Sequence, residues 1–265
     1  MITALAMTAL LVSGTEVHDC PRPDLPFQLD EKVWKALEGS EFYHSLPRSK
    51  TVHLKTVRTL TTSSAPPLNE IQVAGEVTVS ALTPCLRKAD GTATKSIAAK
   101  NGRQTVGTLN SQFYGLNGDF VDLGVQKDGT TVLLVTDLKI SGNLFPIAIG
   151  KTVDIHVEGV SRGQTEVQDQ HCQVAIKSDA AKFDSRLSGA AWEIVCETTL
   201  TMDGKTQEGH RFPVWLEDTG IFLADIAEKS KLGRNYIPSV GGMDLQKMAD
   251  SNLNITWSVY DWTIE

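Results

Sequence analysis

The chain has 265 residues, of which 41% are hydrophobic, and a formal net charge of −7 from 25 basic and 32 acidic side chains. A chain of this length and apolar content can bury a sizeable core. Acidic residues are spread along the chain and the sequence contains no basic patch, which argues against a nucleic acid as the partner. No apolar run reaches the roughly 20 residues of a membrane-spanning helix, so we expect no transmembrane segment.

The N-terminus carries the first local signal. Residues 2–14 (ITALAMTALLVSG) form an apolar, small-residue run of the length typical of a signal-peptide core. We therefore interpret residues 1–14 as a signal peptide and place the protein in the periplasm or outside the cell. A buried N-terminal helix is the alternative, because no Lys or Arg precedes the run.

Residues 15–49 are expected to contain a linker and one short helix. The prolines of PRPDLP (21–26) favour an extended entry into the fold. In the following LDEKVWKALEGS, Asp30 can cap a helix that Gly39 ends, and the apolar side chains between them recur on one side.

From about residue 50 onward the pattern is that of β-strands. Segments such as TVHLKTVRTL, KTVDIHVEGV and AAWEIVCETTLTM alternate β-branched with polar residues, and turn signals such as KDG, SRG and MDG separate them. Adjacent hairpins without long helices predict a mainly β fold, an antiparallel β sandwich or barrel. We expect one β-rich domain over residues 50–265, with one or two short helices near 220–250; a subdivision near 142–150 is the alternative.

The chain has four cysteines, an even number, and none of them stands in a Cys-x-x-Cys pair. Such usage is typical of an exported, disulfide-stabilised protein. Four cysteines allow three pairings. We favour Cys172–Cys196 with Cys20–Cys85, because the first two lie on neighbouring segments.

One hairpin can be placed in register. The dipeptide Asp203-Gly204 suits a two-residue turn, because both of its positions tolerate positive φ angles. This turn puts Glu197 opposite His210, next to the expected disulfide. The pair is a candidate functional pair, a pH-sensitive or catalytic dyad; the alternative is a surface ion pair.

The C-terminal strand supplies a candidate aromatic binding surface. In NITWSVYDWTIE, Tyr260 and Trp262 share one face of the expected strand and could stack on a sugar or pack against a partner. The alternative is that they fill the core of the sheet.

Motifs for known chemistry are missing. The sequence has no Gly-x-Ser-x-Gly elbow, no His-Glu-x-x-His and no paired Cys-x-x-Cys. We therefore assign no catalytic residues, and we expect no cofactor and no metal site. A metal would need ligands that the fold brings together from distant segments.

Two stretches resemble a pattern seen in uncharacterised exported β-rich proteins of bacterial envelopes. They are LFPIAIGKTVDIHVEG (144–159), in which a Phe-Pro-aliphatic-x-Gly-Lys turn feeds a long strand, and WLEDTGIFL (215–223). The resemblance spans about residues 144–223. It implies an envelope location and no particular chemistry.

Together these features favour a non-enzymatic exported protein that binds an envelope ligand or protein of unknown identity. One alternative is a hydrolase acting on an envelope polymer or ester, with residues assembled from distant strands. A second alternative is a structural subunit of an envelope assembly, which would expose unpaired sheet edges for strand addition.

Overall fold

The computed structural model describes residues 19–47, 49–62, 71–99, 102–116, 120–183, 185–223 and 253–264. The expected signal peptide lies outside these ranges. Of the region near 220–250 that was expected to contain short helices, the described residues 221–223 form a strand, and the rest lies outside the described part of the chain.

The described elements are two short α-helices, one 3-10 turn and thirteen strands. In chain order they are α1 (Glu31–Glu38), α2 (Glu41–Ser45), β1 (Val52–Thr62), β2 (Ile71–Ala81), β3 (Arg87–Ala99), β4 (Gly102–Leu116), β5 (Val121–Lys127), β6 (Thr130–Gly142), β7 (Thr152–Ser161), β8 (Gln164–Asp179), η1 (Ala180–Lys182), β9 (Ala190–Met202), β10 (Lys205–Arg211), β11 (Val214–Leu216), β12 (Ile221–Leu223) and β13 (Leu253–Ile264).

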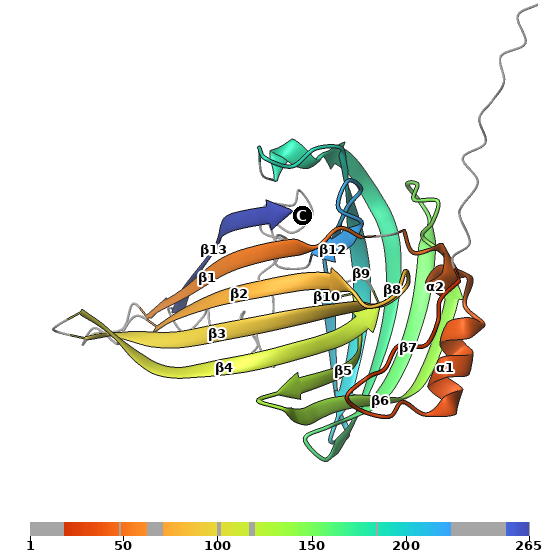
Figure 1. The fold of residues 1–265 in the computed structure, drawn as a ribbon, viewed down its shortest axis with the longest axis horizontal. Helices are drawn as coiled ribbons and strands as arrows, with labels where there is room; N and C mark the ends of the chain where they lie inside the picture. The colour runs from red at the N-terminus through yellow and green to blue at the C-terminus, as the bar shows by residue number, and fades with distance from the viewer. Residues whose placement is uncertain are drawn as a thin grey trace, which may run out of the picture.

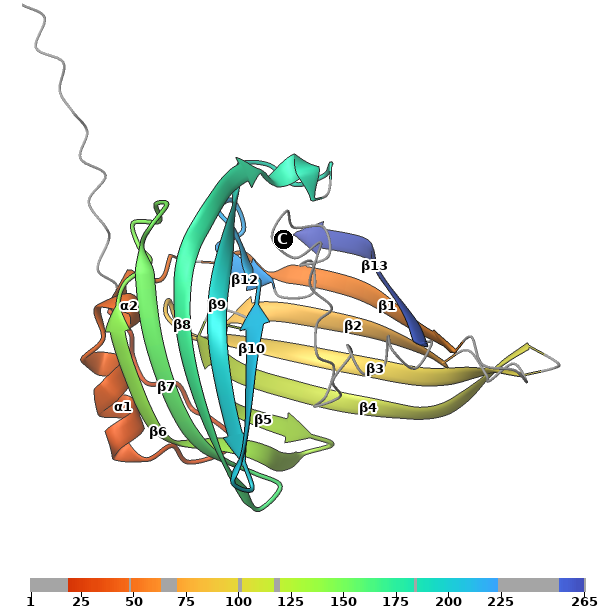
Figure 2. The same cartoon turned by 180° about the vertical axis from the view of Figure 1, so that it is seen from behind.

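All thirteen strands belong to one antiparallel sheet, which confirms the expected mainly β class. The strand order is β12-β11-β9-β8-β7-β6-β5-β4-β3-β2-β1-β13, and β10 pairs with the free part of β9. The sheet curls into a half-barrel, in which β1–β4 run across the direction of β7–β9 (Figure 1). Seen from behind, β10 stands beside β9 at one end of the sheet (Figure 2).

The curled sheet contains β-bulges, seen as shifts in strand register. The pairing of β6 with β7 shifts register between Val135 and Asp137, and that of β8 with β9 shifts between Val174 and Ile176. A bulge adds one residue to one strand, which bends that strand and increases its twist. Bulges of this kind let a long sheet close partway around a core instead of staying flat.

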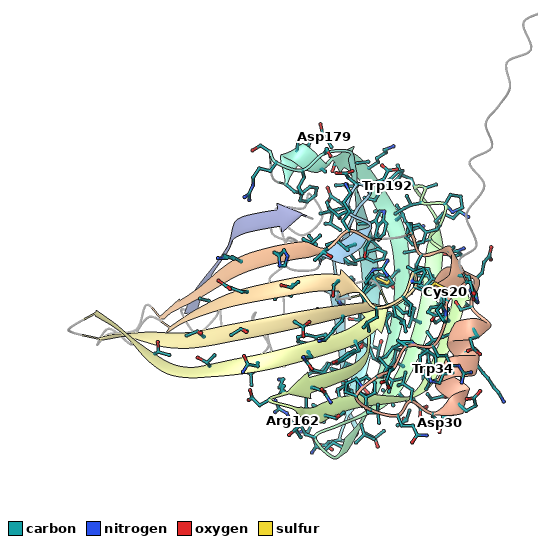
Figure 3. All side chains as sticks on the ribbon, in the orientation of Figure 1. Cys20, Asp30, Trp34, Arg162, Asp179 and Trp192 are labelled. Atoms are coloured by element: carbon teal, nitrogen blue, oxygen red, sulfur yellow. A yellow bond between two sulfur atoms is a disulfide. The ribbon has the colours of Figure 1, made fainter. Side chains whose placement is uncertain are left out.

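The predicted helix is confirmed as α1. The side chain of Asp30 accepts a hydrogen bond from the backbone N–H of Lys32, and Gly39 is the C-terminal cap. Trp34 and Leu37 are buried on the side that faces the sheet, where α1 lies along β6 (Figure 3). Among the described helices, none is long and apolar enough to cross a membrane.

The second helix, α2, was not expected. Ser40 caps it, and its Phe42 and Tyr43 are fully buried. Five residues are too few to show a helical period, so a sequence pattern cannot distinguish this segment from a loop.

Aromatic rings from distant segments meet in the core. Phe120 stacks on Phe222 with ring centroids 4.3 Å apart, and Trp215 lies 4.7 Å from the same ring. Phe145, from the loop between β6 and β7, meets Trp215 edge-on at 5.0 Å. Leu144 and Phe145 of the loop near 142–150 are therefore packed into the core, and the strands that flank this loop pair with each other.

Both expected disulfides are present. Cys20 is bonded to Cys85, which ties the segment before α1 to the turn between β2 and β3. Cys172 is bonded to Cys196, and the two residues lie directly opposite each other on β8 and β9, with Cα atoms 3.9 Å apart. Beyond this bridge, β8 and β9 extend to a connection that contains the 3-10 turn η1 next to Asp179 (Figure 3).

Candidate functional site

One face of the sheet is polar over five neighbouring strands. On β7 and β8, Val153, Ile155 and Cys172 point into the core, and the residues between them are exposed or half-buried. We call the side chains that point away from the core the polar face: Asp137, Lys139, Ser141, Asp154, His156, Glu158, Asp169, His171, Glu197, Thr199, Glu208 and His210.

The strand register arranges these side chains in rows across the sheet, because residues paired on neighbouring strands point to the same face. The first row crosses from β6 to β10 as Ser141, Asp154, His171, Glu197 and His210. Acids and imidazoles therefore alternate along four consecutive strands.

The second row lies two residues further along each strand. It contains Lys139, His156, Asp169, Thr199 and Glu208. Here two basic groups, Lys139 on β6 and His156 on β7, are followed by the acid Asp169 on β8. In both rows each imidazole therefore has an acid beside it on a neighbouring strand.

Two reciprocal pairs join β7 to β8. Nδ1 of His171 lies 2.6 Å from Oδ1 of Asp154, and Nδ1 of His156 lies 2.7 Å from Oδ1 of Asp169. A carboxylate can only accept, so in both pairs the ring Nδ1–H is the donor. The pairs fix the orientation of both rings and direct the Nε2 atoms away from the acids that hold them.

The ring of His156 contacts two acids, one at each nitrogen. The hydrogen bond to Asp169 raises the pKa of His156 above its ordinary value, and a second bond to Glu158, 3.4 Å from Nε2, adds to the rise while partial burial opposes it. The charged imidazolium is therefore favoured between two carboxylates.

A groove of about 720 Å³ runs over the two rows. Its carboxylates are Asp154, Asp169, Glu197 and Glu208, whereas Lys139 is the one lysine in its described lining. The lining also includes hydroxyl groups, three imidazoles and the apolar side chains of Ile140 and Ile155. The groove is therefore acidic, which suits a ligand that donates hydrogen bonds or carries positive charge.

The register predicted from the Asp203-Gly204 turn is the observed one. His210 lies opposite Glu197 on β10 and β9, and both residues line the groove. The pair is thus the end of the first row. The His210 ring also stacks on Phe212, with centroids 6.4 Å apart. The function of this pair stays a prediction.

The predicted aromatic surface lies on β13. This strand pairs with β1, where Trp262 is opposite Leu54 and Tyr260 stands at a register shift. The placement of both aromatic side chains lies outside what the structure describes, so the binding surface there stays a prediction.

A smaller cavity of about 270 Å³ opens on the core face of β5–β8. Phe120, Val135 and Val157 form part of its wall, and Arg211 donates a long hydrogen bond, 3.5 Å, to Oε1 of Gln170 at its side. Its volume lies at the lower limit of small-ligand sites. The groove on the polar face is the larger of these two spaces.

The pairing of the residues in the two reciprocal pairs was not predicted from the sequence. The signal was nevertheless present, because Asp-x-His occurs at 154–156 and again at 169–171, on either side of Arg162-Gly163. Treating Arg162-Gly163 as a two-residue turn places Asp154 opposite His171 and His156 opposite Asp169, as the structure does.

Comparison of the chain with family models, with curated proteins and with solved structures finds no match among any of the three.

Proposed function

We propose that the protein is an exported, non-enzymatic binding protein of the bacterial envelope or extracellular space, and that it binds its ligand in the groove on the polar face. Two disulfides are compatible with an oxidising compartment. The resemblance over residues 144–223 agrees with an envelope location. The single observation that carries the binding proposal is the pair of side-chain rows, which collects hydrogen-bonding groups from five strands over one groove.

The charge of the groove points to a cationic ligand. Its carboxylates outnumber its lysine, and Glu197 on β9 and Glu208 on β10 are both exposed. Like charges gathered on one surface raise the local concentration of an opposite charge. An amine-bearing oligomer can meet several carboxylates of the groove at once, since neighbouring strands are about 4.8 Å apart.

Isothermal titration calorimetry with pentalysine tests the proposal. We expect binding that weakens as salt increases, because exposed charges are screened beyond roughly 10 Å at 0.1 M ionic strength. The double substitution Glu197→Gln/Glu208→Gln should weaken binding about tenfold, which corresponds to roughly 0.7 kcal/mol for each removed charge.

A matched control removes the same net charge elsewhere. Glu41 and Glu217 are exposed acids outside the groove lining. The variant Glu41→Gln/Glu217→Gln should bind pentalysine within about twofold of the unaltered protein, because distant exposed charges contribute little at moderate salt. Equal losses in the two double variants would contradict a specific site in the groove.

The hydrolase alternative is favoured by one observation. In the pair of His171 with Asp154, the acid holds Nδ1 and leaves Nε2 directed away from it, as a general base requires. Hydrolysis of a chromogenic ester that is lost in His171→Gln and retained in His53→Gln would favour this alternative over simple binding.

The alternative that the protein is a structural subunit of an assembly is favoured by strands that have only one described partner strand. Among the described strands, β13 pairs with β1 alone, and β10 pairs with β9 alone. Concentration-dependent self-association in sedimentation velocity, without any binding of pentalysine, would favour a structural subunit.

A further inference from the structure

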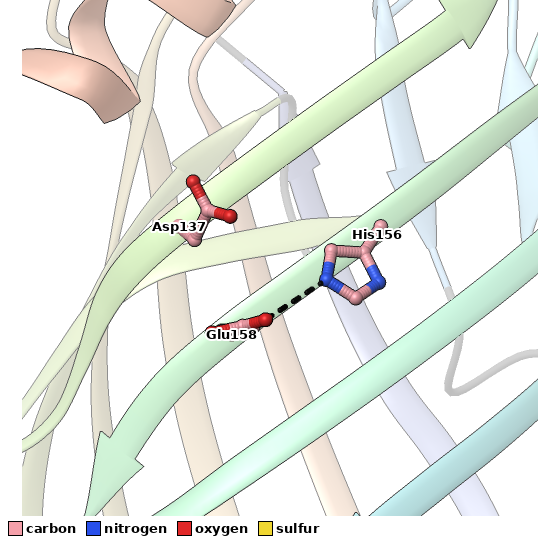
Figure 4. A group of neighbouring side chains, drawn as sticks. All are labelled: Asp137, His156 and Glu158. Carbon is pink, nitrogen blue, oxygen red and sulfur yellow. Dashed lines mark hydrogen bonds and ion pairs between the residues drawn. The ribbon is translucent and has the colours of Figure 1, made fainter.

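Three potential metal ligands meet on β6 and β7 at the edge of the polar face. Asp137, His156 and Glu158 each offer one ligand atom, and these atoms all lie within 4.8 Å of one another (Figure 4). His156 and Glu158 are two residues apart on β7 and therefore share a face, whereas Asp137 is the strand partner of Glu158 on β6. All three residues are half-buried.

We propose that Asp137, His156 and Glu158 form a binding site for a divalent transition-metal ion, with zinc as the best-suited ion. An inorganic ligand at this site goes beyond the groove as a binding surface for an organic cation, because the three side chains share only His156 with the groove lining. It also revises the expectation that the chain has no metal site.

The spacing of the ligand atoms suits tetrahedral zinc. Zinc binds imidazole nitrogen and carboxylate oxygen at about 2.0 to 2.1 Å, so two ligands of one tetrahedral ion lie about 3.3 to 3.4 Å apart. Nε2 of His156 lies 3.4 Å from Oε1 of Glu158, which is this spacing. The carboxylate of Asp137 completes the set after a small side-chain rotation, since its distance to the other atoms is at most 4.8 Å.

A third acid, Asp169, orients the histidine from its other side. Oδ1 of Asp169 accepts a hydrogen bond of 2.7 Å from Nδ1 of His156. Histidine ligands of metal ions are commonly held in this way, because the acid at Nδ1 fixes the ring. A bound ion would take the place of the proton that Nε2 shares with Glu158, since a metal binds only the unprotonated nitrogen. Asp169 is therefore a positioning residue and not a ligand.

The strand geometry brings Asp137 to the site. The register shift on β6 omits Thr136 from the pairing, so Val135 pairs with Gly159 and Asp137 pairs with Glu158. Without the extra residue, the alternation would turn Asp137 to the other face of the sheet.

Two lysines lie near the site and would compete with a metal ion for its carboxylates. Nζ of Lys32 on α1 lies 3.8 Å from Oδ1 of Asp137, with its side chain about half exposed. Lys139 lies beside His156 in the second row. An ammonium group on a flexible, exposed chain can move into water when an ion binds, whereas two carboxylates and one imidazole give the site the charge to hold a divalent ion.

The mixed donor set selects among ions. Imidazole favours zinc and other late transition metals, whereas calcium and magnesium favour sites made of oxygen ligands. Three protein ligands leave one position of a tetrahedral ion for water or for a group of a bound molecule.

Zinc titration by isothermal calorimetry, with the intact disulfide-bonded chain, tests the site with the metal alone. We expect one zinc ion per chain. The substitutions His156→Gln, Glu158→Gln and Asp137→Asn should each weaken zinc binding at least about tenfold, and Asp169→Asn should weaken it about tenfold through loss of ring orientation.

His171→Gln is the matched control, because it removes an imidazole held by an aspartate on the same two strands. His171 does not belong to a group of three close ligand atoms among the described residues. Zinc affinity in His171→Gln should stay within about twofold of the unaltered chain. Calcium should bind at least about tenfold more weakly than zinc.

Cobalt substitution gives a readout that is independent of affinity. Visible absorption bands of tetrahedral Co²⁺ should appear with the unaltered chain and with His171→Gln, and they should be lost or changed in His156→Gln. The inference is overturned if no zinc binds, or if His171→Gln and His156→Gln reduce zinc binding equally. Neither result bears on pentalysine binding, which is measured without metal.

Discussion

His171 on β8 and Asp154 on β7 face each other across the sheet, with Nδ1 of the imidazole 2.6 Å from Oδ1 of the carboxylate. Both side chains are more than half exposed. An exposed pair of this kind contributes less than about 1 kcal/mol to folding. Its consequence for the polar face is the orientation of the ring, which leaves Nε2 as an acceptor toward the groove.

This orientation predicts an unusual tautomer. In neutral His171 the proton should reside on Nδ1, because the carboxylate of Asp154 can only accept. Long-range ¹H–¹⁵N NMR spectra at a pH where the ring is neutral should show this tautomer, and Asp154→Asn should shift the population toward the Nε2–H form. An unchanged ring spectrum in Asp154→Asn would contradict the pairing.

The bridge between Cys172 and Cys196 should be a large contributor to stability. The two residues are 24 positions apart in the sequence. In the chain-entropy model, a closed loop of this length stabilises the fold by about 3 to 4 kcal/mol. Chemical denaturation of Cys172→Ala/Cys196→Ala should show a loss of this size, with Cys20–Cys85 left intact.

We expect a second large loss of folding stability when buried Arg87 is replaced. The residue is 1% exposed. Its guanidinium donates hydrogen bonds to backbone carbonyls of Thr83, Leu86 and Pro47, so it ties the turn before β3 to the segment after α2. Burial lowers the pKa of Arg87 to about 10. Arg87→Met should lower the free energy of unfolding by about 3 kcal/mol, because several carbonyls lose their donor.

Arg87→Lys separates charge from geometry. A lysine keeps the positive charge but has one nitrogen in place of the planar fork that reaches carbonyls on two segments. We therefore expect a destabilisation close to that of Arg87→Met. Full stability of Arg87→Lys in urea unfolding would show that the charge, and not the fork, is what the site requires.

Asp218 predicts a pH dependence of stability. Hydrogen bonds from Ser188, at 2.6 Å, and from Lys50, at 3.1 Å, lower the pKa of Asp218 below its ordinary value. A carboxyl group with a lowered folded-state pKa stabilises the fold above its unfolded-state pKa of about 3.9, and this contribution is lost as the pH falls through the folded-state value.

The matching measurement compares Asp218→Asn with the unaltered chain in urea at pH 7 and at pH 3. The difference in unfolding free energy should be largest at pH 7, below about 1 kcal/mol because the pair is partly exposed, and should shrink at pH 3. Glu217→Gln, one residue away, is the control for the change in net charge. If the difference in unfolding free energy between Asp218→Asn and the unaltered chain grew toward acid pH, it would contradict the lowered pKa of Asp218.

Local sequence patterns were sufficient to predict the mainly β class, the helix α1 and the hairpin that pairs Glu197 with His210. They succeed where a turn fixes the register, as Asp203-Gly204 does with a positive φ at both residues. They do not predict how far the sheet curls, because bulges such as the one at Val135 and Asp137 depend on packing between distant strands.

The polar face was only partly predictable for the same reason. The pairs of Asp154 with His171 and His156 with Asp169 follow from the Arg162-Gly163 turn, so a register count could have found them. The approach of Asp137 to His156 could not be found in this way, since it depends on the bulge in β6. The aromatic core is equally non-local, because Phe120, Phe145 and Phe222 come from three separate connections or strands.

Chemical-shift mapping most directly tests the claim that the groove on the polar face is the binding surface. In ¹H–¹⁵N spectra of the chain titrated with pentalysine, we predict that the largest shifts fall on amides of β7–β10, at and beside Asp154, Asp169, Glu197 and Glu208. Shifts that are absent, or that fall mainly on α1, α2 or β1–β4, would contradict the account.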